Sequence, residues 1–158
     1  MLGLVVQSEG LRRSSSGLIT GPIYFILDGH SFPEVGWDDF VVTILGWWLD
    51  AITRIVRGLS KRERLRFMDG PPIVEFAVGS DGDIAVSLLR DDTRRTPMQA
   101  GRTSRVELAR AFLTAGDAVV KACQANGWSD ADGVDLLEDK VEILRIAAAD
   151  LGKAANVG

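Results

Sequence analysis

The segment from residue 37 to residue 57 places the strongest constraint on how this chain folds. Drawn as a helix, its apolar side chains cover a continuous arc of about 200°. The arc is formed by Phe40, Val41, Val42, Ile44, Leu45, Trp48, Leu49, Ala51, Ile52, Ile55 and Val56. A surface helix buries a narrower stripe, so the pattern predicts a central helix covered on more than one side. Gly36 or Asp38 is expected to cap its start, and Gly58 to end it.

Strand signals lie on both sides of this helix. The predicted strands are residues 2–6, 17–27, 73–78, 84–89 and 94–102. The turn sequence of residues 79–82, Gly-Ser-Asp-Gly, joins two of them into a β-hairpin. Pro97 would confine the last strand to a sheet edge. The basic segment 57–66, between the helix and the hairpin, reads as a loop.

Two amphipathic helices are predicted at the end of the chain. Ser104 and Glu107 form a capping box at the start of a helix over residues 104–126. The last helix is expected to start near residue 129. Its apolar residues recur every three or four positions, at Val134, Leu137, Val141, Leu144, Ala148 and Leu151. This spacing predicts one buried seam and leaves the acidic residues beside it exposed.

The order of these elements indicates an α+β fold. We expect an antiparallel sheet of four to five strands with about three helices packed on one face. A length of 158 residues suits a single domain over residues 1–158. The longest apolar stretch has about ten residues, whereas a membrane span needs about 20. With no secretory signal at the start, we expect a cytoplasmic protein without a membrane partner.

Charge is distributed unevenly along the chain. The net charge of −4 argues against a nucleic-acid partner. Residues 57–66 are mainly basic, and residues 130–142 are mainly acidic. The acidic cluster comprises Asp132, Asp135, Glu138, Asp139 and Glu142. It is either a solvated face or a docking surface for a charged partner.

Motifs for catalysis or metal binding are absent from the sequence. There is no phosphate-binding loop, nucleophile elbow or zinc-protease motif. His30 and Cys123 are the only histidine and cysteine, so neither residue type can form a metal cluster, and we expect no cofactor. One enzymatic alternative stays open, in which His30 acts as a base oriented by Asp28 or Glu34.

Four tryptophans are many for a chain of this size. Trp48 belongs to the apolar arc and Trp47 lies at its edge, whereas Trp37 precedes the helix and Trp128 lies between the last two helices. Tryptophans at loops and rims are frequent in binding hot spots, although each can also pack over a loop. An exposed apolar patch that includes Trp47 would favour a self-associating structural subunit.

Three stretches, FPEVGWDDF at residues 32–40, LGWWL at 45–49 and FMDGP at 67–71, carry a resemblance to a known class of proteins. They resemble small bacterial immunity proteins, which neutralise the toxin domains of polymorphic or contact-dependent systems. The resemblance covers about residues 24–76. It implies a non-enzymatic binder that covers a toxin's active site or a neighbouring surface.

The predicted function is therefore a protein-binding module, with a protein partner such as a basic toxin domain. An acidic surface would bind such a partner quickly and in register. The first predicted surface is the acidic cluster with Trp128 as an anchor. The second is the region of residues 28–39, with Trp37, Asp38 and Asp39 as contacts. The oligomeric state is left open.

Overall fold

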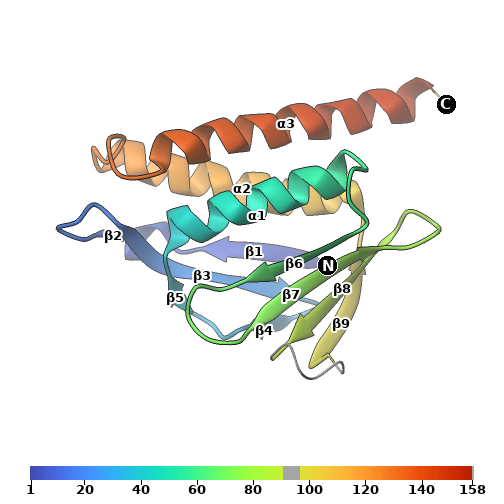
Figure 1. Ribbon diagram of the computed structural model, residues 1–158, viewed down its shortest axis with the longest axis horizontal. Helices are drawn as coiled ribbons and strands as arrows, with labels where there is room; N and C mark the ends of the chain where they lie inside the picture. Colours follow the sequence, from blue (N-terminus) through green and yellow to red (C-terminus); the bar gives the residue numbers. More distant parts are fainter. Residues whose placement is uncertain (91–96, 158) are drawn as a thin grey trace.

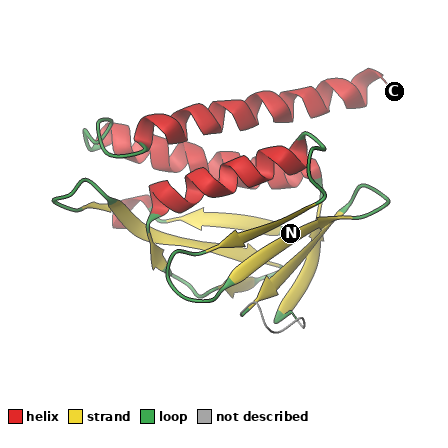
Figure 2. Cartoon of the chain, viewed as in Figure 1, coloured by secondary structure: helices red, strands yellow, loops and turns green. Residues whose placement is uncertain are grey.

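The structure is a computed structural model that describes residues 1–90 and 97–157, the last three of these by their backbone alone. It has an α+β fold, as predicted, and its elements form three layers (Figures 1 and 2). Two antiparallel sheets form one outer layer. Helices α1 (Val41–Val56) and α2 (Arg105–Ala125) form the middle layer, and α3 (Val134–Val157) packs across both of them on the outside.

The first sheet is built around the long strand β3 (Ile19–Leu27). All of its pairings are antiparallel. The strands that pair with β3 are β1 (Leu2–Val6), β2 (Arg12–Arg13), β4 (His30–Phe32) and β5 (Asp38–Asp39). A single 3-10 turn, η1 (Ser8–Gly10), separates β1 from β2.

The second sheet runs in chain order from β6 to β9. Its strands are β6 (Arg62–Arg66), β7 (Ile73–Val78), β8 (Ile84–Leu89) and β9 (Gln99–Thr103). The predicted hairpin is confirmed as β7 and β8, with Val78 opposite Ile84. Gly82 takes a φ of +84° in the turn, a conformation that suits glycine. Strand β9 lies at a sheet edge, as predicted, while residues 94–96 of the predicted strand lie outside the described residues.

The strands are thus divided between two sheets of five and four strands, rather than gathered in one sheet of four to five. Short β2, β4 and β5 are too brief to give a periodic signal. The prediction of a loop over the basic segment 57–66 is wrong, because Arg62–Arg66 form strand β6. In β6, Leu65 is buried and the arginines on either side of it are exposed. Arg62 and Arg64 pair with Glu75 of β7, and Glu63 pairs with Arg54 of α1.

Helix α1 is central, as its wide apolar arc predicts. Twelve of its sixteen residues are buried, and it contacts both sheets and both other helices. It begins later than predicted, because Asp38 and Asp39 pair with β3 as a strand. The predicted cap by Gly36 or Asp38 is therefore wrong, and Phe40 occupies the cap position without a side-chain hydrogen bond.

The two later helices follow their sequence signals closely. The capping box at the start of α2 is confirmed, because Ser104 Oγ accepts from the Glu107 backbone and the Glu107 carboxylate accepts from the Ser104 backbone. Helix α3 begins at Val134 rather than near residue 129, because residues 129–133 form turns and Gly133 takes a φ of +81°, which a helix does not allow. Its predicted seam is buried through Leu144. Cys123 is also buried, and this burial raises the pKa of its thiol.

Aromatic side chains join the two sheets to the middle helices. Trp48 of α1 and Phe112 of α2 both lie against Phe25 of β3, with ring centroids 5.3 and 6.0 Å apart. Phe67, just after β6, lies edge-on to Trp48 at 5.0 Å. Such pairs stabilise a core by about 0.5–1.5 kcal/mol beyond the burial of their area. The core is therefore shared by both sheets and both middle helices, and α3 packs on it through its buried seam.

Candidate protein interface on helices α1 and α3

The acidic cluster predicted from the sequence forms one exposed surface at the first half of α3. Asp135, Glu138, Asp139 and Glu142 are exposed on the helix, and Asp132 is exposed just before it. We call these five residues the acidic face. The face exists because the apolar seam of α3 points to α1 and α2, which leaves the other side of the helix to solvent.

Most of the acidic face carries uncompensated charge. Among the described residues, no ion pair involves Asp132, Asp135, Glu138 or Asp139. Glu142 does have a cation beside it, since Arg145 lies 3.3 Å away and also binds Asp117 at 2.6 Å. The hydrogen bond to Asp117 raises the pKa of the Arg145 guanidinium, with a further contribution from Glu142. The first turns of α3 therefore present a concentrated negative potential.

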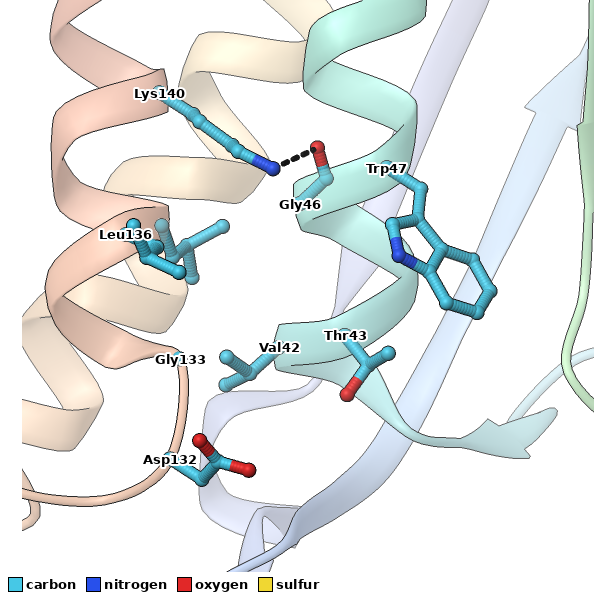
Figure 3. A pocket seen from close by; sticks show the side chains of 9 residues that line it. Val42, Thr43, Gly46, Trp47, Asp132, Gly133, Leu136 and Lys140 are labelled. Atoms are coloured by element: carbon cyan, nitrogen blue, oxygen red, sulfur yellow. Dashed lines mark hydrogen bonds between the residues drawn. The ribbon is translucent and has the colours of Figure 1, made fainter.

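A hollow of about 160 Å³ adjoins this face between α1 and α3 (Figure 3). We call it the α1–α3 groove. Its lining residues are Val42, Thr43, Gly46, Trp47, Asp132, Gly133, Leu136, Leu137 and Lys140. Pockets for small-molecule ligands typically measure about 300–1,000 Å³. The groove is thus closer to the size of one protein side chain than to that of a cofactor.

The two ends of the groove differ in charge. At one end, Lys140 donates to the Gly46 carbonyl at 3.4 Å and pairs with Asp50 at 2.9 Å, which compensates its charge (Figure 3). At the other end lies Asp132, which has no ion pair within the described residues (Figure 3). A basic group on a partner would therefore be attracted to the Asp132 end.

Exposed apolar side chains stand beside the acidic face. Trp47 is 54% exposed and Leu136 is 59% exposed, and both line the groove. Ile143 and Ile146 are also exposed and lie further along the same side of α3. A cluster of apolar residues with a charged rim is the usual composition of a protein–protein interface. The arrangement thus suits binding of a macromolecule.

Trp47 was not among the contacts predicted for this surface, whereas Trp128 was. Trp128 is half-buried and packs against the core at the turn between α2 and α3. Trp47 is the tryptophan that stands open beside the acidic face. Its position at the edge of the apolar arc is the signal for exposure. Trp47 lines the groove together with Asp132, while its indole ring points away from α3 (Figure 3).

In the second predicted surface, residues 28–39, the predicted contact residues form hydrogen bonds or ion pairs within the chain. Asp38 is exposed, but both of its carboxylate oxygens accept hydrogen bonds from the Arg12 guanidinium, at 2.9 and 2.8 Å. Asp39 is only 3% exposed and accepts hydrogen bonds from Trp37 Nε1 and the Met68 backbone. Its prediction as a partner contact is corrected: Asp39 is a buried structural acceptor, and Trp37 is a half-buried donor to it.

The residues of the enzymatic alternative do not form a hydrogen-bonded group. His30 is exposed on β4, and no hydrogen bond links it to Asp28 or Glu34 within the described part of the chain. Asp28 instead pairs with the N-terminal ammonium group of Met1. A histidine base is commonly oriented by a third group within hydrogen-bonding reach. This geometry therefore adds nothing in favour of catalysis at His30.

Two searches of the described residues address metal ions and membranes. They contain no group of three or more His, Cys, Asp or Glu side chains placed to hold a metal ion. None of the described helices is both long enough and apolar enough to cross a lipid bilayer.

Comparisons with models of protein families, with curated protein sequences and with solved structures gave no match to this chain. The resemblance to immunity proteins therefore stays a prediction.

Proposed function

We propose that this chain is a non-enzymatic protein-binding module, an immunity protein that neutralises a basic bacterial toxin domain. The observation that carries the proposal is the acidic face with the exposed Trp47 and Leu136 beside it. Charge accelerates and orients the encounter with a basic partner, and apolar contacts then stabilise the complex. The resemblance of residues 24–76 to immunity proteins supports the same function.

The α1–α3 groove gives this proposal a specific mode of contact. We infer that a long basic side chain of the toxin enters the groove, with its apolar stem along Leu136 and its charge near Asp132. Lysine and arginine side chains cover apolar surfaces in this way while keeping their charge near a polar group.

The partner is best found by affinity capture from a lysate of the source organism at low and high salt. A captured protein that stops growth when expressed alone, and whose toxicity this chain suppresses, would have the required activity. Capture without toxicity would contradict the immunity function and leave only a binding module. Toxicity that this chain fails to suppress would contradict it equally.

The surface is tested with the variant Glu138→Lys/Asp139→Lys and the captured protein. Two charge reversals should weaken binding by about 10–100-fold at low salt, mainly through a slower association rate. The matched control is Glu9→Lys/Asp69→Lys, which changes the net charge equally at two exposed carboxylates outside the acidic face. Equal affinity of both variants for the toxin would contradict docking at the acidic face.

A further inference from the structure

Strand β1 leaves one edge of the first sheet open. One side of β1 pairs with β3, and within residues 1–90 and 97–157 no strand pairs with its other side. Native sheets usually protect such edges with charged residues, proline or a covering element. The sequence of β1, LGLVV, contains neither a charged residue nor proline. This edge is therefore a ready template for another strand.

The pairing with β3 determines which backbone groups face outward. At the two ends of the ladder, Gln7 N donates to the Pro22 carbonyl at 3.2 Å and Asp28 N donates to the Met1 carbonyl at 3.0 Å. Bonded and non-bonded residue pairs alternate along an antiparallel ladder, so the odd-numbered residues of β1 bond to β3. The N–H and C=O groups that point away from β3 are those of Leu2, Leu4 and Val6.

A hollow of about 280 Å³ lies beside this edge, next to the first half of α2. Residues 1–4 all line it, which fits the edge of a strand, because on either face only alternate residues would contribute. From α2, Glu107, Arg110, Ala111 and Thr114 line it at the spacing of one helix face. The edge is thus accessible, and it has free space beside it.

We propose that this edge pairs with the same edge of a second copy of the chain, so that an antiparallel β1–β1 ladder joins the two first sheets. Identical antiparallel strands are related by a two-fold axis, so each presents the groups that the other needs. In the register that uses all the outward groups, Leu4 lies opposite Leu4 of the second copy. Leu2 then lies opposite Val6, and Gly3 lies opposite Val5.

The charges beside this edge do not oppose a second copy. Glu107 and Arg110 beside the hollow have opposite signs, so the region does not repel its own copy. The acidic face, in contrast, would repel an identical face. Self-association is therefore assigned to β1, and the surface on α1 and α3 stays available for a different partner. This inference does not depend on the proposed toxin-binding function.

The first test compares Val6→Pro with Val6→Ala by sedimentation velocity over a range of concentrations. The wild-type chain should sediment as a dimer. Proline at position 6 removes an outward N–H from each copy without removing a bond to β3. It should weaken the dimer about tenfold or more, whereas Val6→Ala keeps the N–H and should weaken it much less. A monomeric wild-type chain at high concentration would overturn the proposal, as would equal dimerisation of both variants.

The second test measures the register directly. Gly3→Cys and Val5→Cys are made as separate variants and mixed with oxidised glutathione as the oxidant. A Cβ at Gly3 meets no atom within 4 Å, so the first variant should fold. In the proposed register these two residues form a non-bonded pair with Cα atoms about 4.5 Å apart, within the range of a disulfide. The mixture should give a covalent dimer and each variant alone should not. Equal cross-linking in all three samples would overturn the register.

Discussion

Replacing Asp39 by asparagine tests whether a buried carboxylate holds the start of α1 in place. One of its oxygens accepts from Trp37 Nε1 at 3.0 Å and from the Met68 backbone at 3.2 Å. The other accepts from the Phe40 backbone at 2.8 Å. Asparagine has nearly the same shape but only one acceptor oxygen. If that oxygen keeps the two bonds to Trp37 and Met68, the amide NH₂ faces the Phe40 N–H.

The magnitude follows from these three bonds. A buried donor left without an acceptor costs about 1–3 kcal/mol, and loss of the charge weakens the two remaining bonds. Asp39→Asn should therefore lower the free energy of unfolding by about 2 kcal/mol. Asp39→Ala removes all three bonds and should lower it by about 4 kcal/mol. Domains of this kind are stable by about 5–15 kcal/mol, so both variants should still fold.

Urea unfolding followed by circular dichroism measures both values. The matched control is Asp38→Asn, next to Asp39, which disturbs only an exposed ion pair with Arg12 and should cost at most about 1 kcal/mol. If the free energy of unfolding of Asp39→Asn lies within about 0.5 kcal/mol of the wild-type value, the carboxylate does not hold the start of α1 in place, and the reasoning is refuted.

Two further outcomes follow from close packing in the core. A Cβ added at Gly116 of α2 would lie 2.6 Å from the buried Val141 Cγ2 of α3, so Gly116→Ala should destabilise the protein by about 1–3 kcal/mol despite its gain in helix propensity. Gly152→Ala, in α3 with no atom near its Cβ, should instead stabilise it by up to about 1 kcal/mol in the same urea assay; a stabilising Gly116→Ala would contradict the close helix contact. Burial raises the pKa of the Cys123 thiol, so at neutral pH the thiol should stay protonated and react with a disulfide reagent only slowly, then quickly in denaturant. Rapid reaction in the native protein would show that this part of α2 opens.

Much of the fold could be predicted because it is encoded by local periodicity. The arc of α1, the capping box of α2 and the β7–β8 hairpin each have a signal within a single stretch of chain. The short strands have no such signal. Asp38 and Asp39 resemble helix-capping residues in the sequence, yet they pair with β3 as a short strand. One of the groups that bonds Asp39 is the backbone of Met68, 29 residues away, and no local pattern could have indicated it.

The candidate site was predicted only in part, for the same reason. The exposure of Asp135, Glu138 and Asp139 follows from their position beside the seam of α3. Trp47 stands at the edge of its own helix arc, and nothing in its neighbourhood along the chain indicates that it borders the same groove as Asp132 and Leu136. The groove exists because Lys140 and Leu136 lie across from Gly46 and Trp47, some 90 residues apart in sequence.

The sequence by itself determined the α+β class, the central position of α1 and the acidic side of α3. These properties depend on the spacing of side chains along one element, and that spacing is set by the period of the helix or strand. Only the tertiary structure decided that the strands form two sheets, that Asp39 is buried and that one side of β1 has no partner strand among the described residues. Those features depend on which distant segments become neighbours. A buried polar group needs a bonding partner from elsewhere in the chain, and a strand edge is covered only if another segment reaches it.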